Sequence, residues 1–422
     1  MLTAVSGINW GDEGKSKMVD MLSNDYDVVV RFQGGNNVGH TVVNEKGKFI
    51  LNLIPSGILR ENVVNVMGNG MVIDIKHLCE EIERLRNAGI VITPDNLKIS
   101  DRAVICMPYS VMQDRLEDER LAYKKHTSTK KGIVPAFSDK FLKKAIKMGD
   151  LLNMSVLANK LETILESKNL LFGSVYDAKS YTLKDLLHYV ETYGKPLIPY
   201  LINSTAFLTK MHNDGKKILL EAQLGALRDI DFGIYPYTTA FHTIASYAPI
   251  GAGVPNIKLD LSIGIMKAYS TCVGAGPFTA EYFGKKAEEL RDAGGEYNVF
   301  GKPGRVGPFD VVASKYGVMV QGADQVALTK LDVLSYLDEI EVCVAYELDG
   351  KQVTELPYPN DLDRCKPIFK TLKGWKCDIS KCRKYEDLPT EAKEYIEFIK
   401  KETGANVKYI SVGAGREEYI VV

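Results

Sequence analysis

Short apolar runs alternate with an amphipathic segment along the first hundred residues of the chain. Strand-length runs occupy residues 26–32, 48–54, 63–67 and 97–100, and the first three end at glycine-containing turns. Residues 74–88 instead repeat apolar positions at helical spacing, at Ile75, Leu78, Ile82 and Leu85. This alternation predicts the α/β class, with a large, mainly parallel central sheet flanked by helices.

The middle of the chain has a different pattern. Residues from about 110 to 215 are polar and helical, with few strand signals. Further on, strand patterns return at 217–221, 261–266, 326–331, 342–346 and 407–412, with a helix at 390–402. No linker or repeat separates these parts. We therefore expect a single α/β domain over residues 1–422 that carries a helical insertion at about 110–215.

A glycine-rich turn follows the first predicted strand. It reads Asn9-Trp10-Gly11-Asp12-Glu13-Gly14-Lys15 and leads into an apolar-periodic segment. Strand, loop and helix in this order point backbone N–H groups and a lysine at phosphates, which predicts a P-loop-like nucleotide site. Only the second half of the strict P-loop motif matches, so a tight turn with exposed charges is the alternative. Asp12 and Glu13 would repel phosphates unless Mg²⁺ lies between them or one acid moves protons.

Other glycine-rich segments follow predicted strands, at 34–39 and 68–70. Because ligands collect at the carboxyl ends of parallel strands, we expect these loops and the loop at 11–14 to share one edge. His40 lies between Gly39 and Thr41 and is a donor suited to charge that develops on a phosphoryl oxygen. An ordinary loop histidine is the alternative reading.

Two further segments are candidates for nucleotide contacts. Lys330 and Asp332 follow an apolar run, and such a pair can recognise guanine, with the carboxylate accepting from its N–H groups. Ser411 and Gly413 follow another run and could contact the base beside them. A solvated strand end explains the lysine and aspartate equally well.

The segment 128–132 is rich in hydroxyl groups and cations, which suits a phosphate cradle or simply a solvated loop. Lys143 and Lys144 belong to a basic segment that we interpret as a solvated helix face. The turn-rich segments 235–239 and 273–277 suit structural turns or the frame of a pocket.

Composition narrows the class of protein. Apolar residues make up 45% and charged residues 25%, as in soluble globular proteins, and the net charge is −1. This balance gives no general attraction to nucleic acid or to an anionic membrane, so neither partner is expected. The chain shows no secretory signal, and its seven cysteines include no Cys-x-x-Cys pair. We therefore expect reduced thiols and a cytoplasmic location.

Taken together, the motifs resemble the adenylosuccinate synthetase family. Matching segments appear in family order at 10–15, 34–41, 55–59, 229–231, 235–237, 267–271, 273–278 and 329–334. The resemblance implies a GTP- and Mg²⁺-dependent ligase, usually a homodimer, that joins aspartate to IMP. It implies that Asp12 takes the N1 proton of IMP, that Asp12 and the Gly39 carbonyl bind the metal, and that His40 stabilises the transferred phosphoryl group.

The resemblance also implies the binding residues. GTP would be held by Gly14, Lys15, Thr41, Lys330, Asp332, Ser411 and Gly413. IMP would be contacted by Asn37, Ser128, Thr129, Thr239 and Val273. Lys143 stands where the family has an arginine that reaches across the dimer to the IMP phosphate.

Departures from the family concentrate in the loop that grips the amine donor. Family members usually carry Thr-Thr-Gly-Arg-x-Arg-Arg there, whereas this chain has Val299, Phe300, Gly301, Lys302, Pro303, Gly304 and Arg305. Lysine and glycine do not reproduce the bidentate grip of arginine on a carboxylate. Leu224 also replaces a nucleotide-binding glutamine, and Gln223 stands one place earlier.

These departures leave alternatives open. The chain is an ordinary adenylosuccinate synthetase with weaker aspartate contacts, a paralogue that couples the activated purine to a different amine, or a nucleotide-binding protein without turnover. Asp12 and His40 argue against the last, because a protein that only binds needs neither. A relative that acts on a guanine nucleotide would tend to lose the acid at position 12, which this chain keeps.

Overall fold

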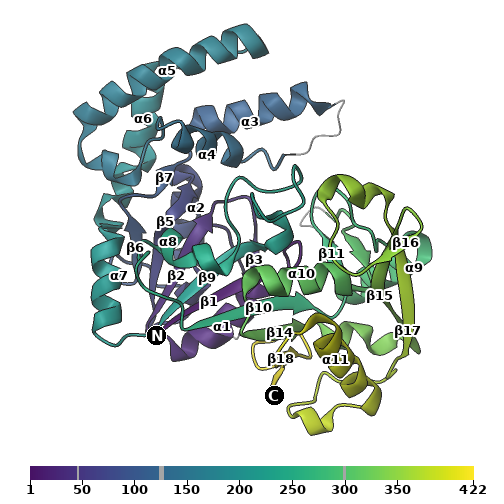
Figure 1. Cartoon of the computed structure of the whole chain (residues 1–422). Coiled ribbons are helices and arrows are strands. Elements are labelled where there is room, and N and C mark those ends of the chain that lie inside the picture. Colours follow the sequence, from purple (N-terminus) through teal and green to yellow (C-terminus); the bar gives the residue numbers. More distant parts are fainter. Residues whose placement is uncertain (45–46, 123–127, 298–300) are drawn as a thin grey trace.

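The computed structural model describes residues 1–44, 47–122, 128–297 and 301–422. Within these ranges the central sheet has eleven strands, and all of its pairings are parallel except that of the last two strands, β18 and β19 (Figure 1). Its strands are β1 (Leu2–Gly7), β2 (Val28–Gly34), β5 (Val64–Ile73), β6 (Leu97–Ser100), β7 (Val104–Ile105), β8 (Leu201–Ile202), β9 (Ile218–Gly225), β10 (Leu261–Lys267), β14 (Gln325–Thr329), β18 (Val407–Ser411) and β19 (Tyr419–Val421). The expected α/β class is confirmed.

The strand order explains why the inner strands are apolar. It runs β19-β18-β14-β10-β1-β9-β2-β5-β6-β8, with β7 beside β5. All six residues of β1 and all seven of β2 are buried, as expected for parallel strands that helices cover on both faces. Helix α1 (Lys15–Leu22) and helix α10 (Val311–Gln321) both pack on β1, while α8 (Ala248–Ala252) packs on β2 and β5.

The carboxyl ends of the parallel strands lie along one edge of the sheet. Strands β1, β2, β9, β10, β14 and β18 share one direction, so the segments that follow them emerge together. This edge gathers the loops after residues 7, 34, 225, 267, 329 and 411. The expected shared edge is therefore present for the glycine-rich loops at 11–14 and 34–39.

The third glycine-rich segment is not a loop, which corrects the sequence interpretation. Residues 68–70 lie inside β5. A side chain at Gly68 would come within 2.7 Å of the Gly251 carbonyl oxygen in α8, and one at Gly70 would overlap the Phe32 carbonyl oxygen of β2. The glycines therefore permit close packing of backbone against the strand.

The apolar run at 48–54 also differs from expectation, because it does not join the central sheet. Strand β4 (Gly47–Leu51) pairs antiparallel with β3 (His40–Asn44) in a separate hairpin. The hairpin places His40 at the start of β3.

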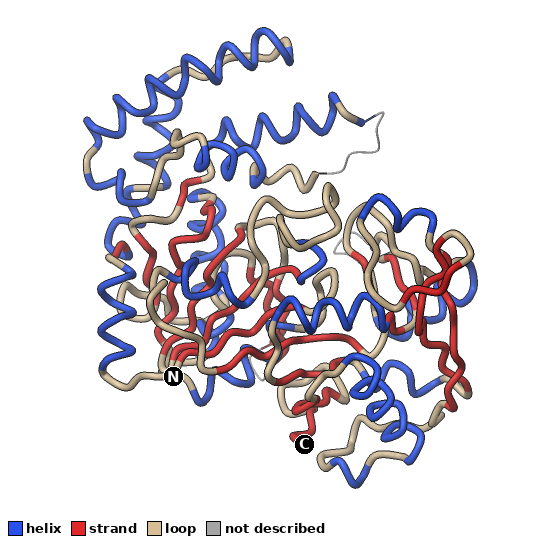
Figure 2. The backbone as a smooth tube through the Cα atoms, viewed as in Figure 1, coloured by secondary structure: helices blue, strands red, loops and turns tan. Residues whose placement is uncertain are grey.

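Helices dominate the middle of the chain. They are α3 (Pro108–Arg120), α4 (Ile133–Phe141), α5 (Met154–Tyr176), α6 (Leu183–Tyr193) and α7 (Ser204–Asn213). Figures 1 and 2 show α3 to α6 stacked beyond the end of the sheet that holds β5 and β7. One apolar cluster joins residues of α5 and α6 to residues of α2 (Ile75–Asn87), β5 and β6. The helices therefore share a core with the sheet.

The second half adds smaller layers beside β14. A four-stranded sheet contains β13 (Phe309–Asp310), β15 (Glu339–Leu348), β16 (Lys351–Val353) and β17 (Lys366–Lys373), and β11 (Ser270–Cys272) pairs with β12 (Arg305–Gly307). Helices α9 (Gly284–Gly294) and α11 (Thr390–Thr403) accompany them (Figure 1). Short 3-10 helices include η2 (Ser56–Leu59), η4 (Met148–Leu152), η5 (Lys195–Tyr200), η6 (Ala226–Arg228) and η8 (Leu331–Tyr336). Across the described ranges, none of the helices combines the length and apolar character that crossing a membrane requires.

Candidate active site

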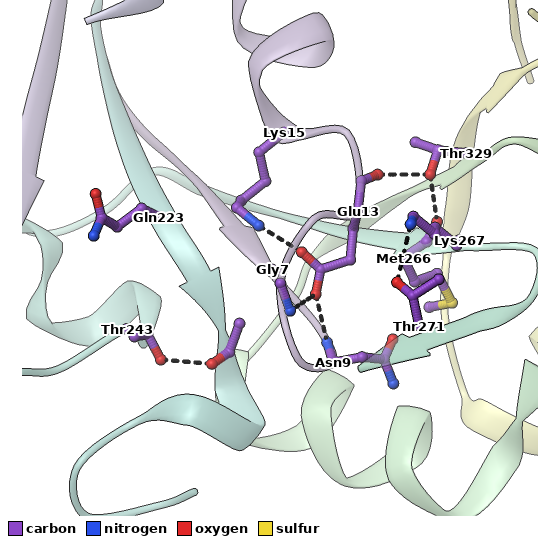
Figure 3. Close-up of polar contacts among 12 residues, drawn as sticks. Gly7, Asn9, Glu13, Lys15, Gln223, Thr243, Met266, Lys267, Thr271 and Thr329 are labelled. Carbon is purple, nitrogen blue, oxygen red and sulfur yellow. Dashed lines mark hydrogen bonds and ion pairs between the residues drawn. The ribbon is translucent and has the colours of Figure 1, made fainter. Parts of the chain in front are cut away.

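Glu13 organises the first glycine-rich loop from within. Its side chain is only 2% exposed. The carboxylate accepts hydrogen bonds from the N–H groups of Asn9 (3.1 Å) and Gly11 (2.8 Å), and it pairs with the ammonium group of Lys15 at 2.5 Å (Figure 3). Glu13 therefore holds the loop and Lys15 in place. This corrects the expectation that both acids of the loop face phosphates.

Asp12 has the opposite setting, although it is the next residue. Its backbone is left-handed (φ 58°), a conformation that aspartate tolerates better than most residues, and its side chain keeps contact with solvent. The surrounding protein nevertheless removes much of its hydration, and this desolvation raises the pKa of Asp12, while the charges of Lys267 and Lys15 oppose the rise. A carboxylate with a raised pKa is a better proton acceptor than an ordinary surface aspartate.

His40 is held by a buried carboxylate. Its Nδ1 lies 2.6 Å from Oε1 of Glu221 on β9, and Glu221 also accepts from the backbone N–H (2.8 Å) and the hydroxyl (2.7 Å) of Ser56. Burial acts to raise the pKa of Glu221, but the hydrogen bond and charge of His40, the charge of Arg31 and the hydrogen bond from Ser56 together lower it. An ionised carboxylate only accepts, so Nδ1 carries the proton.

The other ring nitrogen of His40 has no hydrogen-bond partner within the described part of the chain, although it is buried. Burial, helped by the charge of Arg31, lowers the pKa of His40 to about 4 against the pull of Glu221. The imidazole is therefore neutral at pH 7 in this structure. An anionic phosphoryl group at Nε2 would favour its protonated form, which donates from both nitrogens.

The end of β14 carries the candidate guanine pair. The Lys330 ammonium group donates to the Glu296 carboxylate (2.7 Å) and the Gly294 carbonyl oxygen (2.8 Å). Asp332 has a buried Oδ1 that lacks a partner among the residues that the structure describes, and burial raises the pKa of this group. A buried oxygen without a donor suits the N–H groups of a guanine ring. Thr329 ties this segment to the first loop by a bond to the Glu13 carbonyl oxygen (2.6 Å; Figure 3).

A lysine that sequence reasoning missed connects α1 to the end of β18. The Lys17 ammonium group donates to the Ser411 hydroxyl (2.8 Å) and to the Gly413 carbonyl oxygen (2.6 Å). Desolvation lowers the pKa of Lys17 to about 8. Lys17 therefore positions Ser411 and Gly413 beside the first loop, and only its place two residues after Lys15 hinted at this in the sequence.

Two other expected phosphate contacts lie on the same loops. Gly14 is the left-handed residue before α1 (φ 89°), and a side chain there would come within 3.7 Å of Thr329. Thr41 lies on β3, next to His40, with an exposed side chain.

The start of α4 comes close to the second glycine-rich loop. A side chain at Gly35 would come within 2.5 Å of Ile133, the first residue of α4. The hydroxyl of Ser128 donates to Asp114 (2.6 Å), and Thr129 is exposed. Asn37, on the second loop itself, is half-buried.

The structure corrects the interpretation of the basic segment as a helix face. Helix α4 ends at Phe141, so Lys143 and Lys144 follow it instead of lying on it. Lys143 has a left-handed backbone (φ 61°) and an exposed side chain.

Arg228, which the sequence did not single out, joins two other expected nucleotide contacts. Its buried guanidinium group donates to the carbonyl oxygens of Tyr237 and Val273, and to that of Ala275 at 3.2 Å. Its own carbonyl oxygen accepts from the Thr239 N–H at 2.9 Å. Arg228 thus holds the segments of Thr239 and Val273 together. These contacts join residues far apart in the chain, so no local sequence pattern predicts them.

The amine-donor loop is only partly described, because Val299 and Phe300 lie outside the described residues. Lys302 is exposed. Arg305 binds Glu281 in a bidentate manner, with Nε 2.9 Å from Oε1 and Nη2 2.6 Å from Oε2, and its Nη1 donates to the Gly276 carbonyl oxygen (2.8 Å). The guanidinium group is therefore already engaged by a carboxylate of the protein.

The residues gathered at this edge of the sheet suit an enzyme that transfers a phosphoryl group from a purine nucleoside triphosphate. Comparison with known proteins makes this specific, because the family model described as adenylosuccinate synthetase matches residues 4–420. The chain belongs to the adenylosuccinate synthetase family, whose members are GTP-dependent C–N ligases of purine biosynthesis.

Individual relatives agree with this assignment. The adenylosuccinate synthetase of Caldanaerobacter subterraneus is 42% identical over 423 residues, covering 100% of this chain and 99% of that protein. The Streptococcus sanguinis adenylosuccinate synthetase is 40% identical over 416 residues, covering 98% and 96%. The fully ligated adenylosuccinate synthetase structure from Plasmodium falciparum has a TM-score of 0.92 at 34% identity and covers 100% and 99%. The cyanophage S-2L succinoaminodeoxyadenylate synthetase shares the fold, with a TM-score of 0.60 at 16% identity.

These findings confirm the predicted family, the ligase class and GTP as co-substrate. Members of the family join IMP and aspartate. Nothing in the relatives supports the alternatives of a different amine donor or of a protein without turnover.

Proposed function

We propose that Asp12 and His40 carry the phosphoryl-transfer step by which this ligase activates IMP for aspartate. The observation that supports this most is the Glu221–His40 pair, which leaves a buried Nε2 with no partner in the described structure. Asp12, with its raised pKa, lies on the loop after β1, at the same edge of the sheet. A base and a phosphoryl-stabilising group are the two functions that this reaction requires.

The proposed reaction has two steps, phosphoryl transfer to IMP and then attack by aspartate. Asp12 accepts the N1 proton of IMP while O6 attacks the γ-phosphorus of GTP, and the bond from that phosphorus to the bridging oxygen breaks to release GDP. His40 donates from Nε2 to the transferring phosphoryl group. The amine of aspartate then attacks C6, inorganic phosphate leaves with O6, and the amine loses a proton.

We propose that the GTP triphosphate lies over the first loop, at Gly14 and Lys15, with Thr41 beside it. Glu13 supports this assignment because it holds Lys15 at the start of α1. Lys330, Asp332, Ser411 and Gly413 would surround the guanine. The unpaired Oδ1 of Asp332 and the Lys17 bonds to Ser411 and Gly413 support this part.

The IMP site in this proposal contains Asn37, Ser128, Thr129, Thr239 and Val273. Packing of Ile133 against Gly35 supports placing the segment of Ser128 and Thr129 near Asn37. The hydrogen bonds of Arg228 support placing Thr239 near Val273. We propose in addition that the protein is a homodimer in which the exposed Lys143 reaches the partner's IMP phosphate. Sedimentation of the purified chain at the mass of one chain would contradict the dimer.

Mg²⁺ fits the oxygen donors of the proposed site. Asp12 offers a carboxylate and Gly39 a carbonyl oxygen, and both residues are exposed. The described residues contain no group of three or more His, Cys, Asp or Glu residues arranged to hold a metal. Mg²⁺ suits such a sparse set, since it usually binds one or two protein oxygens together with substrate phosphates and water. When bound, it would neutralise phosphate charge.

The donor loop, with Lys302, Arg305, Val299 and Phe300, is our candidate for the aspartate site. Because Glu281 already occupies Arg305, we expect aspartate to saturate the enzyme only weakly. A low-micromolar KM for aspartate would contradict this.

We propose the cytoplasm as the compartment of this enzyme. All seven cysteines are free thiols, which suits a reducing environment.

The test is formation of adenylosuccinate from GTP, IMP and aspartate by the purified chain. Asp12→Asn and His40→Asn should each reduce kcat by about 10²- to 10⁴-fold, while GTP still binds. His188→Asn, on the exposed face of α6, is the matched control and should keep the activity of the unmodified protein. Undiminished turnover in either active-site variant would contradict the assignment.

A further inference from the structure

We propose that Gln223 is a positioning residue that fixes which end of the Asn37 amide faces the nucleotide. Asn37 would thereby present N–H donors, and not its carbonyl oxygen, to an acceptor oxygen of IMP. The inference rests on the proposed function, because it takes Asn37 to contact IMP.

Gln223 lies at the base of the second glycine-rich loop. It belongs to β9, where its side chain is 0% exposed. A side chain at Gly34 would overlap the Gln223 amide, so this amide packs directly against the start of the loop. In Figure 3 it stands apart from the Glu13–Lys15 pair.

Arg31 determines the orientation of the Gln223 amide. The guanidinium Nη2 of Arg31 donates to Oε1 of Gln223. A guanidinium group has donors and no acceptor, so the oxygen of Gln223 must face Arg31. Its Nε2 then faces the other way and donates to Oδ1 of Asn37 at 2.8 Å. Since Oδ1 of Asn37 is engaged by Gln223, Nδ2 lies on the opposite side of the Asn37 amide.

Arg31, Gln223 and Asn37 form a relay of hydrogen bonds. Arg31, at the buried end of this relay, can act only as a donor. Arg31 lies on β2 with 0% exposure, and burial lowers its pKa, while the charges of Glu221 and Glu81 oppose this and favour its ionised form. Glu221 also binds His40 at 2.6 Å. One buried arginine therefore binds Gln223, which holds Asn37, and also interacts electrostatically with the carboxylate that holds the histidine.

The fixed polarity has a consequence for the ligand. Asn37 is half-buried, so its outward N–H groups can meet a ligand. They favour a phosphate or carbonyl oxygen and disfavour another donor. Without the relay, the Asn37 amide could turn either way, and part of the protein would present the wrong atom.

The test uses equilibrium binding of IMP, measured by calorimetry, together with steady-state kinetics. Gln223→Met removes both polar atoms of the Gln223 side chain, Oε1 and Nε2, and replaces it with a side chain of similar size. It should weaken IMP binding about fivefold and raise the KM for IMP equally, with kcat and the KM for GTP within twofold. In an Asn37→Ala background the same change should have no further effect. Gln325→Met is the matched glutamine control, because Gln325 begins β14 whereas the candidate site follows the other end of that strand. This variant should bind IMP normally.

Gln223→Glu separates positioning from a merely structural role. A glutamate would satisfy Arg31 at least as well, but it would draw Nδ2 of Asn37 inward and turn Oδ1 toward the ligand. We expect a loss of IMP affinity of at least fivefold, with thermal stability retained. Unchanged IMP affinity in Gln223→Met, or a loss that persists in the Asn37→Ala background, would overturn the proposal. Failure of the unmodified protein to form adenylosuccinate would instead refute the proposed function, and the binding comparison would still decide the role of Gln223.

Discussion

Asp12 and Glu13 are adjacent carboxylates that the fold gives different tasks. The Glu13 carboxylate binds two backbone N–H groups and Lys15, so it stabilises the loop and is not available to a ligand. Asp12 makes a left-handed turn and keeps solvent contact, with desolvation raising its pKa. Environment, and not residue type, therefore distinguishes Asp12 as the base in our proposal.

At the residue scale, the buried His40 makes the stability of the protein depend on pH. Its pKa of about 4 lies below the ordinary value of 6.5 because burial disfavours its charged form. Between these values the unfolded chain binds more protons, so the stability linked to His40 is lost as pH falls from 6.5 toward 4. His40→Asn should remove this loss, which denaturant unfolding at several pH values measures.

The quantity to compare is the difference in unfolding free energy between the unmodified protein and the His40→Asn variant at each pH. Burial raises the pKa of Asp310 to about 6 from 3.8, and this group acts in the opposite direction over much of the same range. Asp310 is present in both proteins, so its contribution cancels. Equal slopes of stability against pH in the two proteins would contradict the assigned state of His40.

At the element scale, some glycines permit close packing and others lie in open space, and a matched pair of variants distinguishes the two cases. Gly70→Ala would force a methyl group onto the Phe32 carbonyl oxygen, so it should lower stability by more than about 1 kcal/mol. Gly173→Ala lies within α5, where the space around the new carbon is open, and should raise stability by about 0.5–1 kcal/mol. Thermal unfolding measures both. A neutral Gly70→Ala would show that α8 and β2 do not close on β5.

Elements with strong local signals were predictable from the sequence. Helix α2 has apolar positions at helical spacing and is capped at its N-terminus by Asp74, whose side chain accepts from the His77 N–H at 3.0 Å. Strand β6 matches its predicted range, 97–100. The run at 48–54 was placed in the wrong sheet because apolar runs do not reveal their pairing partner.

The site was predictable only where a motif or the family resemblance marked it. Asp12, His40, Lys330 and Asp332 stand in recognisable sequence motifs. Arg228, Lys17 and Glu221 act through partners 45, 394 and 181 residues away, at Val273, Ser411 and His40. Such contacts depend on the strand order of the sheet, which local patterns do not specify.

At the scale of the whole molecule, the sheet assembles one site from distant parts of the chain. Strands β1, β9, β10, β14 and β18 run parallel, so segments from residue 8 to residue 413 meet at one edge. Helices on both faces leave this edge as the place where a nucleotide can reach the ends of all these strands. The two purine nucleotides of the reaction can therefore be positioned by one rigid layer.

The central claim is that O6 of IMP attacks the γ-phosphate of GTP at this edge. Reaction of the complete enzyme with IMP labelled with oxygen-18 at the 6-oxo group tests it most directly. Mass spectrometry should find one labelled oxygen in each inorganic phosphate released, matched by one adenylosuccinate, and His40→Asn should slow the appearance of the labelled phosphate. Unlabelled phosphate alongside adenylosuccinate would contradict the account, because the oxygen of IMP would then not have been phosphorylated.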